Sequence, residues 1–209
     1  MNGKHWFVTT LLVGALAAGA TAAFQQEKKP EKAPVPAASA DDPMMKAMME
    51  LGSPGPAHKV LEHRIGKWTA AGKWFMPGST EPYMTGEYQS EAKWINDGRF
   101  VEEIVTGDFA GASFRGTAII GYDNLKKKYV QTWMDNMSTG LFYAEGTYDA
   151  ASKTFTFMGE SPDSTMTKYV KTRSTDKMID ADHGVAQSFQ PGPDGKEYMA
   201  MEISYTRVK

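Results

Sequence analysis

Cysteine is absent from this 209-residue sequence. Without it the chain can form no disulfide, no zinc–thiolate site and no thiol nucleophile, and it has no cysteine to carry a lipoprotein anchor. An excess of positive charge is also missing, because the formal net charge is -2 and no long run of Lys or Arg occurs. Since phosphate binding depends on clustered cations, we expect no nucleic-acid partner.

Long apolar runs are missing as well, except at the N-terminus. Residues 1–23 combine a charged head at Lys4, an uncharged run that starts at Trp6, and small residues just before Phe24. This arrangement is typical of a secretory signal peptide with an A-x-A-like cleavage site. The alternative is an uncleaved anchor, because the run approaches the about 17 to 25 residues that span a bilayer. We expect an exported protein, periplasmic or secreted, with no stable membrane span after cleavage.

The segment that follows, residues 24–40, is rich in Pro, Ala and charged residues. Such a composition buries too little apolar surface to become ordered, so we predict a flexible linker. The folded domain is then expected over residues 41–209. Its first residues, DDPMMKAMMELG, offer Asp41 or Asp42 as helix N-cap and Pro43 at the first helical position, and a second pattern of this kind, PAHKVLEHRIG, follows. We therefore predict one or two short N-terminal helices.

Methionines recur at helical spacing in the first of these helices. They are Met44, Met45, Met48 and Met49. Paired thioethers suit Cu(I), but a pliable methionine face that packs on the barrel or on a partner is the interpretation we favour. His58 and His63 are five residues apart and do not share a helix face as an i, i+4 metal pair would. We expect no metal site.

From Lys67 onward the period of the sequence changes from helical to alternating. In TGEYQSEAKW every second residue is small or aromatic while the others are mostly polar, which is the pattern of a strand with one dry face. ASFRGTAIIGY, KTFTF and YMAMEISYTR repeat it, and turn signals such as NDG and PDG separate the runs. The predicted strands are residues 67–76, 83–95, 99–107, 112–122, 127–135, 139–148, 153–159, 166–174, 178–190 and 196–207.

The short links between these strands favour antiparallel pairing of sequence neighbours. About ten strands with one apolar face must split into two sheets or close, and closure removes the exposed edges. We predict an all-β, antiparallel up-and-down barrel of the calycin-like kind. In a closed meander the first strand pairs with the last, so Arg207 is expected to stack on Trp68 as a structural clasp. The alternative is that Arg207 receives an anionic ligand.

The stretch RIGKWTAAGKWF places two large rings and two small residues in one phase of the first strand. Trp68, Ala70, Gly72 and Trp74 share the inward face. The glycine permits the bend of a coiled strand, and the small residues leave space between the rings. That space is either filled core or a residual cavity lined by aromatic rings, the usual form of a small-ligand site. The sequence alone leaves both interpretations open.

Several runs together resemble one bacterial family. GPAHKVLEHRIGKW, GRFVEE, GASFRGTAIIGYDNLKKKYVQTWMDNMSTG, YDAASKTFTFMGE and EISYTR are similar to the family called domain of unknown function 1579, over about residues 55 to 208. The resemblance implies a lipocalin-like or calycin-type barrel and supplies no catalytic residues. The Gly66-x-Trp68 pair is similar to the lipocalin opening signature. A more distant likeness to nitrobindin-type barrels would imply haem, but His183, in the turn-like DADHG, is a poor axial ligand and we expect no cofactor.

The sequence contains no recognisable catalytic motif. GxSxG, a Walker loop, HExxH and a dinucleotide fingerprint are all absent. The candidate ligand-binding residues are therefore aromatic and polar side chains in the inward phase: Trp68, Trp74, Tyr88, Trp94, Phe114, Tyr122, Gln131, Trp133 and Asp135. Gln131 and Asp135 would be polar groups among aromatic rings. Such groups must form hydrogen bonds within the protein or bind a ligand.

Three hypotheses about function remain. We favour an exported, non-enzymatic barrel that binds a small apolar or amphipathic molecule, with Gln131 or Asp135 orienting it. The second is an enzyme that uses Asp135, Glu145 or His183 as acid or base, which fold analogy supports only weakly. The third is a structural or interaction barrel that docks a partner through its Met-rich helix. The sequence predicts neither the ligand nor the oligomeric state.

Overall fold

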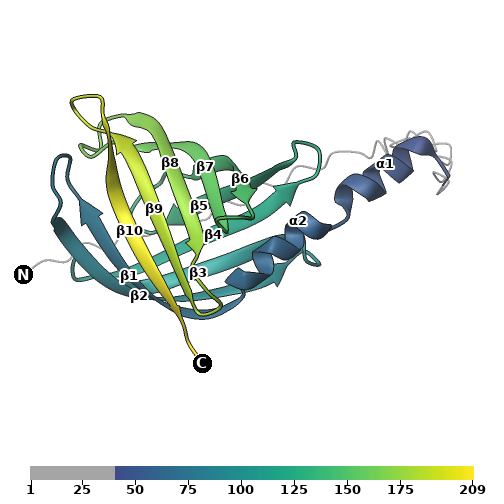
Figure 1. Ribbon diagram of the computed structural model, residues 1–209, viewed down its shortest axis with the longest axis horizontal. Helices are drawn as coiled ribbons and strands as arrows, with labels where there is room; N and C mark the ends of the chain where they lie inside the picture. Colours follow the sequence, from purple (N-terminus) through teal and green to yellow (C-terminus); the bar gives the residue numbers. More distant parts are fainter. Residues whose placement is uncertain (1–40) are drawn as a thin grey trace, which may run out of the picture. The chain divides into compact units, whose positions relative to one another are not determined.

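The structure is a computed structural model that describes residues 41–209. The strands are β1 (Gly66–Phe75), β2 (Pro82–Ile95), β3 (Phe100–Phe109), β4 (Ala112–Asp123), β5 (Lys128–Asp135), β6 (Phe142–Asp149), β7 (Thr154–Pro162), β8 (Tyr169–Met178), β9 (His183–Pro191) and β10 (Glu197–Arg207). They form one closed antiparallel barrel in which sequence neighbours pair and β1 pairs with β10 (Figure 1). The predicted up-and-down barrel is confirmed. The predicted signal peptide (1–23) and linker (24–40) lie outside the described residues.

Two short helices and a 3-10 turn precede the barrel. Helix α1 spans Pro43–Gly52, α2 spans Pro56–Lys59, and the 3-10 helix η1 continues over Val60–Arg64. As predicted, Asp42 caps α1 by accepting a hydrogen bond from the backbone N–H of Met44. No residue of α1 is buried, so its methionine face does not pack on the barrel. Within residues 41–209, no helix is long and apolar enough to cross a bilayer.

Most strand boundaries fall within three residues of their predicted positions, but the β8–β9 region differs more. The strands predicted at 166–174 and 178–190 are observed at Tyr169–Met178 and His183–Pro191. The turn between them is closed by Asp180, which accepts a hydrogen bond from the backbone N–H of Asp182. Neither glycine nor proline marks this turn, and the polar sequence of β8 has no apolar alternation to show where it ends.

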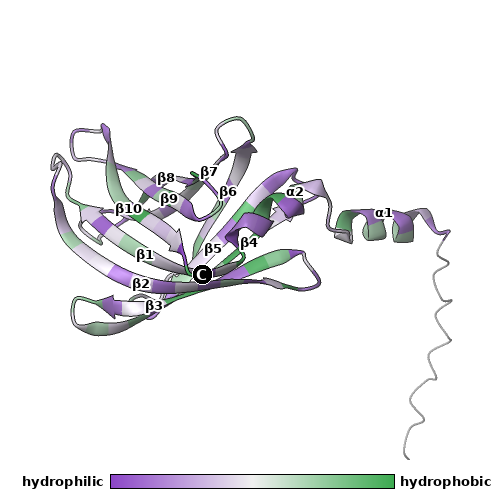
Figure 2. Ribbon diagram, turned by 60° about the horizontal axis from the view of Figure 1, so that its bottom comes forward, coloured by the Kyte–Doolittle hydropathy of each residue, from purple (hydrophilic) through white to green (hydrophobic). Residues whose placement is uncertain are grey.

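The barrel has two unlike ends. At one of them, here called the helix end, α2 lies beside β4 in both ribbon views (Figures 1 and 2). The η1 side chain Leu61 enters the barrel there and is fully buried with Val101, Phe155 and Phe157. The other end, where the β1–β2, β3–β4, β5–β6, β7–β8 and β9–β10 turns lie, is called the open end. The helix end therefore contains the densest part of the apolar core.

Candidate ligand-binding interior

Five aromatic side chains gather inside the barrel in the half near the open end. We call them the aromatic box, and they are Trp74, Tyr88, Phe109, Phe114 and Trp133. The ring centroids of Tyr88 and Phe114 are 5.4 Å apart, and Trp74 meets Phe109 edge-on at 5.7 Å. The rings of Phe114 and Trp133 are stacked at 6.3 Å. Edge-to-face and offset-stacked pairs of this kind are the favoured aromatic arrangements.

Glycines set the positions of the two indoles. A Cβ atom on Gly72 would lie 2.5 Å from the ring of Trp74, and one on Gly116 would likewise collide with the ring of Trp133. Each indole therefore lies over a glycine and turns its other face away from it. The small residues between Trp68 and Trp74 thus have a specific use, because Gly72 makes room for the ring of Trp74.

The box is accessible although its side chains point into the barrel. Trp74, Phe109, Phe114 and Trp133 are all partly exposed, whereas Phe155, inward-facing at the helix end, is only 1% exposed. All four lie within two residues of the strand ends at the open end, so solvent reaches their rings from that end of the barrel. The interior is thus filled at the helix end and accessible from the open end.

Polar side chains line the side of the barrel formed by β7 to β9. The hydroxyls of Ser161 and Thr172 lie 2.6 Å apart, and Gln190 donates a hydrogen bond of 2.8 Å to Ser161. Across the interior, the Gln131 amide lies 3.5 Å from the hydroxyl of Ser174. Ser174 and Gln190 are partly exposed, like the box. The accessible interior therefore has an aromatic wall on β1 to β5 and a polar wall on β7 to β9.

Asp135 lies at the rim of this interior, at the end of β5. One carboxylate oxygen accepts the indole N–H of Trp133 at 2.8 Å. The other accepts the backbone N–H groups of Met137 and Ser138 at 3.0 and 3.1 Å. Among the described residues its hydrogen-bond donors are all neutral and it forms no ion pair. The carboxylate thus fixes the orientation of Trp133 and keeps its negative charge uncompensated.

Three predicted ligand-binding residues lie away from the box. Trp94 and Tyr122 pack against the core of the helix end, and the ring of Tyr122 meets Tyr129 edge-on at 4.9 Å. Trp68 is 7% exposed, and its indole N–H donates to the backbone carbonyl of Arg64 at 2.9 Å. The structure therefore brings Trp74, Tyr88, Phe114, Gln131, Trp133 and Asp135 to the accessible interior and leaves Trp68, Trp94 and Tyr122 at the other end.

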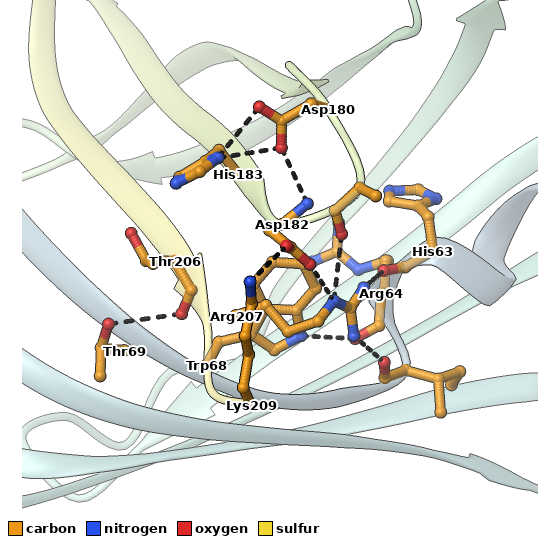
Figure 3. Close-up of polar contacts among 12 residues, drawn as sticks. His63, Arg64, Trp68, Thr69, Asp180, Asp182, His183, Thr206, Arg207 and Lys209 are labelled. Carbon is orange, nitrogen blue, oxygen red and sulfur yellow. Dashed lines mark hydrogen bonds and ion pairs between the residues drawn. The ribbon is translucent and has the colours of Figure 1, made fainter.

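The expected contact between Arg207 and Trp68 is present. The two residues are paired in the register of β1 and β10, and the guanidinium carbon lies 4.0 Å from the indole ring (Figure 3). The guanidinium also donates to the backbone carbonyls of His63, Ile65 and Ala181. Three of its five N–H groups thus have backbone acceptors, and the carboxylate of Asp182 lies 3.5 Å from Nε.

A buried ionic cluster at the helix end was not predicted from the sequence. Arg64 enters the barrel from η1, donates to Glu103 at 2.9 Å and forms an ion pair with Asp176. Ser90 donates to the other oxygen of Glu103 at 2.6 Å. Beside these groups and Tyr205 is a pocket of about 40 Å³, which is room for two or three water molecules. Glu103 could have been found from the sequence, because it lies in the phase of the buried Val101 and Val105.

The proposed acid and base residues are not assembled into one site. Glu145 lies on the outer face of β6, where hydrogen bonds from Lys126 and Lys128 hold its pKa at about 2. His183 is exposed, and its Nδ1 lies 2.9 Å from a carboxylate oxygen of Asp180. Asp135 is at the open end, whereas His183 is at the helix end. No described arrangement therefore brings two of these three groups to one substrate.

The described histidines also do not fit a haem in the accessible interior. His58 accepts the backbone N–H of Gly55, and His63 bonds to the carbonyl of Val60 through Nδ1 and stacks on Phe155. His183 lies in the outward phase of β9, because its neighbour Gly184 pairs with the inward Tyr205. No histidine among residues 41–209 points into the aromatic box, so we derive no chemistry through haem.

His63 makes the barrel sensitive to acid. Burial, together with the nearby charges of Arg64 and Arg207, lowers the pKa of His63 to about 4. Between about pH 6.5 and 4 the unfolded chain therefore binds a proton that the folded chain does not. The contribution of neutral His63 to the unfolding free energy is complete above pH 6.5. It is lost as the pH falls through this window, by at most about 3 kcal/mol.

Urea unfolding of the wild type and of His63→Gln at several pH values tests this. The expected result is that the difference in unfolding free energy between the two proteins shrinks as the pH falls from 7 to 4. A difference that does not change with pH would show that the folded environment does not perturb His63.

The comparisons with known proteins agree with the geometry. The sequence profile of DUF1579, described as a protein of unknown function, matches residues 53–207. No curated protein matches the chain. Among solved structures, Rv2717c from M. tuberculosis is similar with a TM-score of 0.53 and 12% identity, covering 75% of this chain and 100% of that one. A redesigned β-barrel is similar with a TM-score of 0.37 and 8% identity, covering 73% and 96% of the two chains. At 12% identity the likeness to Rv2717c shows the barrel fold alone, whereas the profile match spans most of the described domain and shows that the chain belongs to the DUF1579 family.

Proposed function

We propose that this protein is an exported binding barrel that holds a small amphipathic molecule inside its open half. The observation that carries the proposal is the partial exposure of inward-facing rings, Trp74, Phe114 and Trp133 above all. Exposed apolar surface inside a barrel is costly in water and is covered when a ligand enters. Export rests on residues 1–23 alone, which lie outside the described structure.

The two walls of the accessible interior support an amphipathic ligand. A flat apolar part would lie against the aromatic box, where both indoles turn one face away from their glycines. A polar part would meet the side chains of Gln131, Ser174 and Gln190 on the facing wall. These hydrogen-bonding groups would orient the ligand, while the rings would provide most of the binding energy.

Filling the interior should abolish binding. Ser174 faces inward on β8, opposite Ser188 on β9, so Ser174→Phe places a ring in the accessible space. We expect this variant to bind N-phenyl-1-naphthylamine, a neutral fluorescent probe of apolar sites, at least tenfold more weakly than the wild type. If the interior were filled, the same change would instead overpack the core and cost about 1 to 3 kcal/mol of stability.

Thr175→Phe is the matched control, because Thr175 is the next residue of β8 and points outward. It should bind the probe as the wild type does. Urea unfolding of both variants separates filling of the interior from loss of the fold. Failure of the wild type to bind the probe, or equal binding by the wild type and Ser174→Phe, would overturn the proposal.

A further inference from the structure

The charges inside the barrel are unevenly distributed between its two ends. Following the alternation of each strand, the inward-facing charged residues are Glu103, Asp135, Asp176 and Arg207, and Arg64 enters from η1. The two arginines are held at the helix end by carboxylates and backbone carbonyls. Every lysine of the ten strands lies in the outward phase. The open half of the described interior therefore contains one formal charge, the carboxylate of Asp135, and no cation.

Asp135 acts directly on the aromatic box. Its carboxylate accepts the indole N–H of Trp133 at 2.8 Å, which places a negative charge at the edge of that ring. The face of an aromatic ring is itself the negative end of a quadrupole, and Trp is the ring that attracts cations best. A positive charge over Trp133 would therefore be attracted by both the ring and the carboxylate.

A second carboxylate adds to the negative potential at this end. Burial and the charge of Asp108 raise the pKa of Tyr88, so Asp108 lies close enough for its field to act on a ring of the box. Asp108 lies near the end of β3 and accepts the backbone N–H of Gly111. Asp108 is in the outward phase of β3, so the charge inside the open half is that of Asp135 alone, and it favours cations over anions there.

We infer that the ligand of the barrel is an organic cation whose ammonium group lies in the aromatic box beside Asp135. This inference rests on the proposed function and specifies the chemical class of its ligand. Aromatic cages combined with a carboxylate suit alkylated ammonium groups, because these groups are weakly hydrated and are held by the faces of several rings. Fatty acids and other anionic amphiphiles would meet an uncompensated carboxylate without a neighbouring cation and would be rejected.

Three probes of similar shape and different charge test the inference. Phenyltrimethylammonium is a cation, tert-butylbenzene is its neutral isostere, and benzenesulfonate carries a tetrahedral anionic group. Titration of the protein with each probe, followed by protein NMR shifts, gives the three affinities. We expect the cation to bind about tenfold more tightly than the neutral probe, and the anion to bind more weakly than either.

A pair of turn-capping aspartates provides the variant and its control. Asp135→Asn keeps a carbonyl oxygen for the backbone N–H groups of Met137 and Ser138 but removes the charge and the acceptor of the Trp133 indole N–H, and the neutral probe reports any effect of the second change. It should weaken binding of the cation about tenfold and change the affinity for tert-butylbenzene less than threefold. Asp149 caps the β6–β7 turn at the helix end in the same way, so Asp149→Asn should leave all three affinities unchanged.

The outcomes separate the two proposals. Equal affinities for the three probes, or tightest binding of the neutral probe or the anion, would overturn the cation inference while the binding barrel stands. Unchanged cation affinity in Asp135→Asn would also overturn it. If neither these probes nor N-phenyl-1-naphthylamine bind the wild type, the proposed function fails together with the inference.

Discussion

Replacing Arg64 by methionine is expected to destabilise the barrel by about 3 to 5 kcal/mol. Arg64 is the counterion of two carboxylates inside the barrel, Glu103 and Asp176, whose side chains are 7% and 19% exposed. Methionine fills a similar volume but leaves both largely buried charges without an ionic partner. Urea unfolding at pH 7 gives the change in unfolding free energy.

Two further comparisons test whether the loss comes from the buried cluster rather than from the removal of any arginine. Arg173 is half-exposed on the outer face, where it pairs with Glu197 and lies 4.0 Å from the ring of Phe189. Arg173→Met should cost only about 1 kcal/mol. In a background of Glu103→Gln and Asp176→Asn, the Arg64→Met change should cost far less than it does alone, because no carboxylate is left unpaired. A loss of less than about 1 kcal/mol for Arg64→Met in the wild-type background would contradict this account.

The barrel itself was predictable because its cause is local. Alternation of small or aromatic residues with polar ones marks the strands, and short turns between them leave an antiparallel meander as the simple arrangement. The pairing of Trp68 with Arg207 then followed from closure of the barrel. The end of β8 was predicted poorly because KTRSTDKM has polar residues on both faces and provides no alternation to follow.

The functional interior was only partly predictable, for two physical reasons. Alternation tells which face a residue occupies but not how deep it lies, and a candidate list built on alternation alone combined Trp94 and Tyr122 with Phe114 and Trp133. Phe109 was missed because the predicted strand, residues 99–107, stopped before it.

Contacts between segments that are far apart in the sequence could not be predicted from local patterns. Arg64 belongs to η1 rather than to a strand, and its partner Glu103 is 39 positions along the chain. Asp176 is much further along and lies on the polar strand β8. Only the closed barrel, with η1 inserted at the helix end, brings the three side chains together.

Arg207→Lys is expected to destabilise the protein by about 2 to 4 kcal/mol, although the charge is kept. The guanidinium donates hydrogen bonds of 2.7 Å to the carbonyl of Ile65, 2.8 Å to His63 and 3.0 Å to Ala181, and it stacks on Trp68 (Figure 3). It thus joins the end of β10 to the η1–β1 link and to the β8–β9 turn. An ammonium group is a point charge and cannot reach three carbonyls in the geometry of a planar fork, so at least one would lose its donor.

Denaturant unfolding with a double-mutant cycle separates the stacking from the hydrogen bonds. Combining Arg207→Met with Trp68→Leu should give a coupling energy of about 0.5 to 2 kcal/mol, which is the range of a cation–π contact. Asp182 lies 3.5 Å from the Arg207 guanidinium and 3.7 Å from the exposed ammonium of Lys209. Lys209→Ala is therefore the control and should cost less than about 0.5 kcal/mol. Zero coupling between positions 68 and 207 would show that the rings and the guanidinium only lie side by side. A cost for Arg207→Lys no larger than that of Lys209→Ala would show that β10 is held in place by its strand pairing alone.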